Sequence, residues 1–270
     1  MSAADTPQPH PYYPIGVEIA GYIANESSVF VLAICFSLGL AAILGLILAS
    51  ATYLRPSMSK ADKLAILWFA LCKYLVDFLF QKSVCADNHA NAAGTLHCFF
   101  EAYFVSHHSA MGPAQDILGQ LWKEYALSDS RYLISDPFVV SIETITVTHD
   151  WLEIRLIDLC LWNGQTVWGP LCFVLAYMIA AQHPLRHALQ VIICVAHLYG
   201  DALYYATSLF NHYVNGVSYC RPEALYFWGY FFFMNFIWIV VPASYLYESL
   251  TAISNAFRAL DRTAGRQKFE

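Results

Sequence analysis

The sequence predicts an all-α integral membrane protein, a bundle of five helices with an intramembrane cavity for a ligand. Of the 270 residues, 58% are hydrophobic and only 13% are charged, whereas soluble proteins average about 25% charged residues. Long apolar runs recur along the chain, and a few ionisable residues interrupt them. A charged side chain inside a bilayer costs roughly 2.5 kcal/mol or more, so such residues usually face a bundle interior and have a function.

Three apolar stretches are each long enough to cross a bilayer, which requires about 20 residues. They are 27–54, which contains no charged residue, 185–210, which Asp201 interrupts, and 225–247, which is rich in aromatic residues. The remaining apolar sequence falls into four fragments that are too short to cross comfortably, at 64–72, 94–106, 138–147 and 166–181. Joined in consecutive pairs, these fragments supply two further spans, which brings the total to five.

Two polar segments separate the paired fragments, at 73–93 and at about 148–165. Polar backbone and side chains at membrane depth would be costly, so we interpret both segments as insertions into a five-span domain at 27–250. One hypothesis is that they are retained introns. The alternatives are a loop that leaves a split helix, or a separate helix over 64–80, and sequencing the transcript distinguishes these cases.

Basic residues predict the orientation of the spans. They follow the first span, lie between the third and fourth, and follow the fifth, which places them on one side if the chain crosses five times. The positive-inside rule assigns that side to the cytosol. The segment 1–26 is then lumenal and the tail 251–270 is cytosolic. The basic residues are Arg55, Lys60, Lys63, Arg186, Arg258, Arg262, Arg266 and Lys268.

The composition also argues against several classes of protein. The net charge of −6 is spread along the chain without a basic patch, so nucleic acid is not an expected partner. The eight cysteines show no CxxC or Cys/His spacing, so we predict neither a metal site nor a disulfide framework. The first 26 residues lack the apolar core of a cleavable signal peptide, so the first span is expected to act as its own insertion signal.

His97 and Glu101 are four residues apart within an apolar run. On a helix, this spacing places both side chains on one face. A carboxylate beside an imidazole fixes the orientation of the ring and favours its protonated form. The pair is therefore suited to deliver a proton into an apolar pocket. A structural hydrogen bond between helices, or a weak two-ligand metal site, is the alternative.

Glu143 is a second acid in an apolar run, followed by Thr144 and Thr146. A threonine in a span often bonds its own helix backbone, so the two threonines are ambiguous. The local backbone has nothing that satisfies a buried carboxylate. Glu143 therefore needs a donor from another helix, or a ligand.

The fourth and fifth spans add further polar candidates. Asn235 lies deep in the aromatic run, and Trp238 follows three residues later near the same face. An indole face stabilises a desolvated cation by up to about 2 kcal/mol, although ordinary packing also accounts for Trp238. Asp201 is another buried acid, which the neighbouring Tyr199 and Tyr204 are placed to satisfy. His197, in the same span, is a secondary pocket candidate.

Several motifs distributed along nearly the whole chain are similar to those of a known family. They are Gln120-Leu121-Trp122-Lys123-Glu124-Tyr125-Ala126, Asp129-Ser130-Arg131-Tyr132, Glu143-Thr144-Ile145-Thr146, Trp168-Gly169-Pro170, His183-Pro184-Leu185-Arg186, Tyr199-Gly200-Asp201, Tyr226-Phe227-Trp228 and Met234-Asn235. On these motifs the chain resembles the emopamil-binding protein family, the sterol Δ8–Δ7 isomerases with an EXPERA-type membrane domain. The family sequence is continuous at both points where the two polar segments interrupt this chain.

The resemblance implies a five-helix fold of the endoplasmic reticulum membrane and an intramolecular isomerase of the cholestenol Δ-isomerase type, without a cofactor or metal. It implies a sterol as the substrate, in contact with membrane lipid. The oligomeric state is open, and a homodimer is one alternative. The implied catalytic residues are His97, Glu101 and Glu143, and the implied substrate-binding residues are Thr146, Asn235 and Trp238, together with Tyr125 and Asp201 from the matched motifs.

In the mechanism that this resemblance implies, protonated His97 is the proton donor, oriented by Glu101, and Glu143 accepts the proton from C7 of the sterol. The roles of acid and base are exchangeable, because a buried carboxyl group can also be held protonated. Asn235 is expected to orient one of the acids. Two other functions stay open: the same proton chemistry on a terpenoid or meroterpenoid, and a non-catalytic protein that binds sterols or amphiphiles.

Overall fold

The computed structural model describes residues 9–71, 96–147 and 168–267, and within these ranges the chain forms helices and loops without a strand. The segments interpreted as insertions, 73–93 and 148–165, lie outside the described residues. Three of the described helical stretches are long and apolar enough to cross a membrane, at Val29–Leu54, Arg186–Tyr213 and Leu225–Ala264. They correspond to the three long apolar runs of the sequence, and they confirm the prediction of an all-helical membrane protein at that level.

Helix α1 (Val29–Leu54) begins where the side chain of Ser28 accepts a hydrogen bond from the backbone N–H of Val31. This cap satisfies one of the backbone donors that a helix start leaves free. Only a narrow stripe of α1 is buried, at Leu32, Ile43, Ile47 and Ala51. The rest of its apolar surface is exposed, as expected of a helix that faces lipid.

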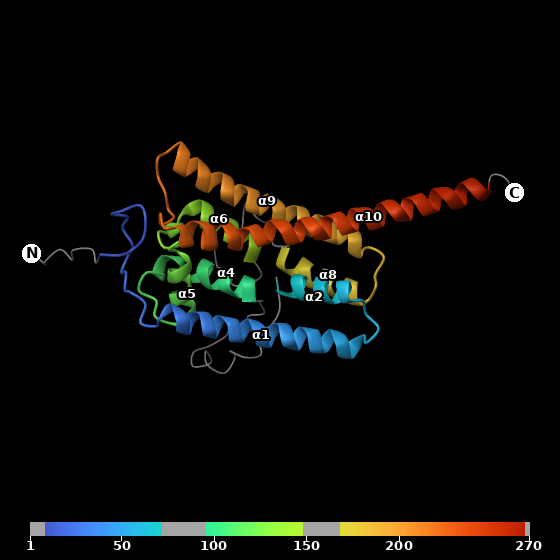
Figure 1. Cartoon of the computed structure of the whole chain (residues 1–270), viewed down its shortest axis with the longest axis horizontal. Coiled ribbons are helices and arrows are strands. Elements are labelled where there is room, and N and C mark those ends of the chain that lie inside the picture. Colours follow the sequence, from blue (N-terminus) through green and yellow to red (C-terminus); the bar gives the residue numbers. More distant parts are fainter. Residues whose placement is uncertain (1–8, 72–95, 148–167, 268–270) are drawn as a thin grey trace, which may run out of the picture.

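Helices α2 (Lys60–Leu71) and α4 (Leu96–His107) follow one another in a single row beside α1 (Figure 1). α2 packs in one core with the second half of α1 and with α8. α4 lies near the first half of α1, where the rings of Phe36 and Phe100 are 6.4 Å apart. The two short helices thus lie where a single helix antiparallel to α1 would lie.

Helices α6 (Pro137–Val147) and α8 (Trp168–Ala180) show a similar arrangement. α6 starts at Pro137, directly after Asp136, whose side chain accepts from the N–H groups of residues 138 and 139. Proline suits this position because the first turn needs no N–H. α6 packs along α4, and α8 packs along α2. At the far end, the Gln182 side chain that follows α8 donates to Asp62 of α2 over 3.2 Å.

Helix α9 (Arg186–Tyr213) runs antiparallel to the last helical stretch, which consists of η3 (Leu225–Met234) and α10 (Asn235–Gln267) (Figure 1). The ten residues of η3 form a π-helix. This wider helix is rare and is frequent at functional sites. Its carbonyl at Phe232 accepts a 2.7 Å hydrogen bond from the Tyr205 hydroxyl of α9. The predicted tail at 251–270 continues α10 as a helix through Gln267 and extends beyond the other helices (Figure 1).

The end of the bundle near the N-terminus is closed by residues 9–27, α5 (Ile117–Tyr125) and two short turns, η1 (His108–Ala110) and η2 (Ser130–Tyr132). The Lys123 ammonium donates to the carbonyl of Ile23 over 2.8 Å, and the Tyr12 hydroxyl donates to the carbonyl of Lys123 over 3.0 Å. Burial lowers the pKa of Lys123. These contacts hold the N-terminal segment against the loop that positions the site.

Candidate active site

Two acidic side chains from neighbouring helices meet inside the bundle. Glu101 of α4 is 5% exposed and Glu143 of α6 is 8% exposed. Their carboxyl groups lie within hydrogen-bonding reach of each other. Two ionised carboxyl groups at such a separation repel each other, and one proton shared between them removes this repulsion. The site therefore contains one group able to give a proton and one able to accept it.

The position of Glu101 is fixed by α5. The Trp122 indole of α5 stacks on the ring of Phe100, with 4.0 Å between ring centroids, and its N–H donates to the Phe100 carbonyl over 2.8 Å. Phe100 directly precedes Glu101. The loop at the closed end of the bundle thus holds the turn of α4 that carries the first acid.

Tyr132 of η2 donates a 2.6 Å hydrogen bond from its hydroxyl to Oε1 of Glu143. It is 4% exposed, and the rings of Trp122, Phe104 and Tyr125 surround it at 4.8 to 5.3 Å. Burial raises the pKa of Tyr132 well above its usual value, and the charge of Glu143 adds to this effect. Tyr132 is therefore a neutral donor that favours the ionised form of Glu143.

The sequence pattern alone predicts no role for Tyr132. Its signal was present in the matched motif Asp129-Ser130-Arg131-Tyr132. An acid in an apolar run stands out because burying its charge is costly. A tyrosine in a loop carries no charge and gives no such signal.

A buried ion pair next to Tyr132 in the chain holds the loop that carries it. The Arg131 guanidinium binds both carboxylate oxygens of Asp129, with Nε at 2.9 and 3.0 Å and Nη2 at 2.6 Å, and both side chains are almost fully buried. Arg131 also donates to Thr207 and Ser208 of α9. This network joins the loop that carries Tyr132 to α9.

The expected partners of Asp201 need correction. The Tyr204 hydroxyl donates to Asp129 over 2.8 Å, and Tyr199 is 66% exposed. Tyr204 therefore belongs to the ion-pair network. Asp201 instead acts electrostatically on Glu101 and on Tyr205, which places its charge near the carboxyl pair.

Asn235 and Tyr125 meet on another side of the acids. Tyr125 is within hydrogen-bonding reach of Asn235 and Tyr204. The charge of Glu143 contributes to raising the pKa of Tyr125. The Asn235 amide donates to the carbonyl of Phe231 over 2.7 Å, across the junction of η3 and α10. The sequence predicted that Asn235 orients an acid, whereas its contacts in the structure are this carbonyl and Tyr125.

Trp238 lies among three helices. Its ring centroid is 4.7 Å from that of Trp68 on α2 and 6.1 Å from that of His197 on α9. His197 acts electrostatically on Glu101. Trp238 thus contacts a histidine that lies near Glu101.

Of the predicted site residues, Glu101, Glu143, Tyr125, Asn235, Asp201 and Trp238 gather around one centre in the structure. His97 lies in α4 one turn before Glu101, and Thr146 lies in α6 three residues after Glu143. The side chains of His97 and Thr146 lie outside the described part of the chain, and their roles stay predictions. Within the described part, no group of three His, Cys, Asp or Glu side chains is arranged to hold a metal ion.

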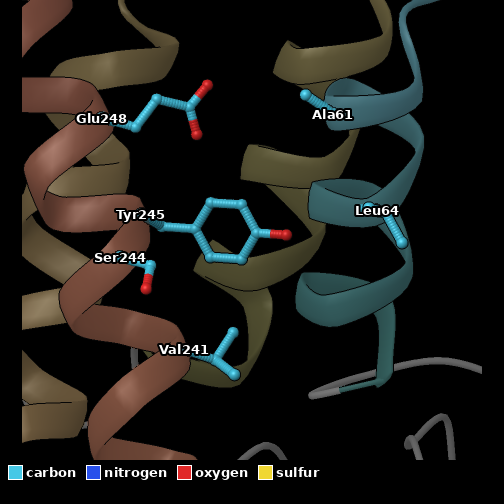
Figure 2. Close-up of a pocket in the computed structure, with 6 residues that line it drawn as sticks. All are labelled: Ala61, Leu64, Val241, Ser244, Tyr245 and Glu248. Carbon is cyan, nitrogen blue, oxygen red and sulfur yellow. The ribbon is translucent and has the colours of Figure 1, made fainter.

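A hollow of about 300 Å³ opens between α2 and α10, one helical turn beyond the Trp68–Trp238 contact. Figure 2 shows the Tyr245 ring of α10 extending towards α2 across this space. The hollow is lined by Ala61, Leu64, Val241, Ser244, Tyr245 and Glu248. It adjoins the contact between Trp68 and Trp238 and is not lined by Glu101 or Glu143. The predicted cavity around the two acids therefore stays a prediction.

The membrane-length helices and the paired interior carboxyl groups define an integral membrane protein with a polar centre suited to proton transfer. Comparison with known proteins shows what the chain is similar to. Residues 117–249 match the model of the EXPERA (expanded EBP) superfamily, so the chain is similar to this superfamily over that range. The matched range contains Tyr132, Glu143, Asn235 and Trp238, and Glu101 precedes it.

Individual relatives match over more of the chain. The chain is 29% identical over 269 residues to the 3-beta-hydroxysteroid-Delta(8),Delta(7)-isomerase of Cavia porcellus, which covers 99% of both proteins. It is 29% identical over 254 residues to the enzyme of the same name from Rattus norvegicus, covering 93% of this chain and 92% of the relative. It is 25% identical over 190 residues to a protoglabretal synthase of Citrus sinensis, covering 70% and 69%.

Proposed function

We propose that this protein is a membrane-embedded isomerase that shifts the Δ8 double bond of a sterol to Δ7. The observation that carries the proposal is the interior pair of Glu101 and Glu143, in a chain that aligns almost end to end with relatives named as Δ8,Δ7-isomerases. The reaction requires one proton donor and one proton acceptor, and the pair supplies both.

The reaction adds a proton to C9, which converts the C8–C9 double bond into a tertiary cation at C8. Loss of a proton from C7 then places the double bond between C7 and C8, so the proton gained equals the proton lost. Tyr132 donates to Glu143, which favours the ionised form of Glu143 and makes it the acceptor of the C7 proton. In this proposal the shared proton resides on Glu101, and His97, one helical turn earlier in α4, is the residue that exchanges it.

The cation at C8 needs stabilisation without water, because water would trap it. The ionised Glu143 supplies negative charge close to the reacting carbons, and such fixed charges are effective in a water-poor site. Trp238 offers its ring face to the same charge. Asn235 and Tyr125 hold the aromatic side of the site in place through their mutual contact.

The chain directions support five crossings of the membrane. α1 and α9 run in opposite directions, α2 and α4 form one row, and the start of α1 and the end of α10 lie at opposite ends of the described part of the chain (Figure 1). Residues 1–26 are then lumenal and 251–270 cytosolic, as the basic residues predict. We assign the protein to the endoplasmic reticulum membrane on the basis of its family.

A sterol is preferred over a terpenoid as the substrate. The relatives named as terpenoid synthases, from Citrus sinensis and Melia azedarach, are 25% identical over 70% of the chain, whereas the sterol isomerase relatives match at 29% over 93% or more. A protein that only binds sterols does not require two interior carboxyl groups in contact, so the acid pair favours catalysis.

Expression in a yeast strain that lacks its sterol C8 isomerase tests the proposal. We expect Δ8 sterols to decrease and Δ7 sterols to appear in the mass-spectrometric sterol profile. Membranes incubated in deuterated water should yield Δ7 product with one deuterium at C9. A variant without residues 73–93 and 148–165 should be at least as active, because the paired helices are then continuous. An unchanged sterol profile with well-expressed protein of both forms would refute the proposal.

Tyr132→Phe is expected to lower kcat by about 10- to 100-fold with little change in KM. The substitution removes the 2.6 Å hydrogen bond to Glu143, and a hydrogen bond to a charged group contributes about 1.5–3 kcal/mol. Steady-state isomerisation in purified membranes measures the effect. Tyr177→Phe is the matched control, because Tyr177 is 74% exposed on α8. Equal activity of the two variants would contradict a role for Tyr132.

A further inference from the structure

Several buried polar atoms have no hydrogen-bond partner among the described residues, and two of them belong to side chains that pack against Trp238. These two are the indole N–H of Trp68, at Nε1, and the Nδ1 atom of His197. Buried polar groups in native proteins are nearly always paired, and an exception needs a physical explanation. A binding site whose ligand is absent from the structure provides such an explanation.

Both atoms belong to rings that pack against Trp238. The centroid of Trp68 lies 4.7 Å from that of Trp238 at an interplanar angle of 48°, and His197 meets the Trp238 ring edge-on at 6.1 Å. The two side chains come from different helices, α2 and α9. They therefore converge on one residue of the site without belonging to one local turn.

The two atoms have complementary hydrogen-bonding properties. An indole N–H is only a donor, and Nδ1 of a histidine that carries its proton on Nε2 is an acceptor. A hydroxyl group both accepts and donates. A single hydroxyl within reach of both atoms would satisfy both at once.

We propose that Trp68 and His197 form a subsite for the hydroxyl group of the substrate. Trp68 Nε1–H donates to the hydroxyl oxygen, and the hydroxyl donates to Nδ1 of His197. This inference rests on the proposed function, because it places the hydroxyl end of a polycyclic alcohol beside Trp238 and its reacting carbons near Glu101. His197 also lies near Glu101, so the subsite adjoins the acid pair.

The hydroxyl position is consistent with two other observations. The Cavia porcellus and Rattus norvegicus relatives are named for 3-beta-hydroxysteroids. The hollow between α2 and α10 lies next to Trp68, because Leu64, which lines the hollow, lies one helical turn before Trp68 on α2. An apolar ring system therefore has open space on the side of the subsite where α2 and α10 separate (Figure 2).

Equilibrium binding of a radiolabelled Δ8 sterol to the purified full-length chain in lipid nanodiscs tests the subsite. The 3β-alcohol and its 3-deoxy analogue are compared. We expect the wild-type protein to prefer the alcohol by at least about tenfold, the factor that corresponds to about 1.4 kcal/mol. Trp68→Phe and His197→Phe should each remove most of this preference while affinity for the deoxy analogue stays within twofold.

Trp228→Phe is the matched control, because Trp228 is 60% exposed on η3, and it should keep the wild-type preference. The unliganded Trp68→Phe variant should unfold at the same temperature as the wild type or higher, because the substitution removes an unpaired buried donor. Two results would overturn the subsite. One is equal binding of alcohol and deoxy analogue by the wild type, as expected if a water bridges the two atoms. The other is an undiminished preference in both variants.

The isomerisation assay separates this inference from the proposed function. If the variants lose the hydroxyl preference but the wild-type protein converts no sterol, the subsite is supported and the isomerase function is refuted. Conversion of Δ8 to Δ7 sterol with an undiminished preference in the variants would retain the isomerase and reject the subsite.

Discussion

Glu143→Gln is expected to reduce kcat for sterol isomerisation by about a thousandfold, within the range that a positioned general base contributes. The amide has the size of the carboxyl group and still accepts the hydrogen bond from Tyr132. It cannot take the proton from C7, and it carries no negative charge for the cation at C8. The measurement is kcat on a Δ8 sterol in membranes, with thermal unfolding of the purified variant as a check of the fold.

The same variant should also bind cationic amphiphiles more weakly, because these resemble the charge of the intermediate. Glu18→Gln makes the identical change on an exposed residue of the N-terminal segment and should leave both readouts unaltered. Turnover of Glu143→Gln near the wild-type rate would exclude Glu143 as the base and, with it, the assignment of the proton to Glu101.

The acids were predictable from the sequence because burying a carboxyl group in an apolar run has a large energetic cost. Glu101 and Glu143 stand out for that reason alone, and the structure brings them into contact. The joining of the four short fragments into two further spans stays a prediction, made from the length that a bilayer requires. α2 and α4 lie in one row, as this joining requires.

The supporting residues were not predictable, because they lie where polar sequence is ordinary. Asp129, Arg131 and Tyr132 occupy a loop between spans, where charged residues are common and usually solvated. Only the fold shows that this loop is buried and that Arg131 reaches α9. The π-helix at 225–234 is a similar case, since its aromatic composition fits an α-helix equally well.

The grouping of Trp68 with His197 was also not predictable from the sequence, because it depends on the fold. Trp68 lies in a short apolar fragment and His197 in a long span, and nothing in their spacing connects them. Their common neighbour is Trp238, on a third helix. Contacts among three helices that are distant in sequence are beyond what the pattern of a single sequence predicts.

Arg131→Met is expected to destabilise the protein by about 3–5 kcal/mol, the typical cost of removing one partner of a buried ion pair. Asp129 then keeps its charge at 1% exposure, with the Tyr204 hydroxyl and the N–H of Arg131 as its remaining donors. At about 2–4 °C per kcal/mol for a domain of this size, the unfolding midpoint should fall by roughly 10 °C. Thermal unfolding in detergent micelles measures the shift.

Arg221→Met is the matched control, because Arg221 also pairs with an acid two residues away, Glu223, whose side chain is 48% exposed. An exposed pair contributes at most about 1 kcal/mol, so its midpoint should change by only a few degrees. The double variant Asp129→Asn/Arg131→Met should regain part of the loss, since no unpaired charge is left in the interior. If the double variant is no more stable than Arg131→Met, the unpaired charge is not the cause of the loss. The hydrogen bonds from Arg131 to Thr207 and Ser208 would then be what holds Tyr132 against Glu143.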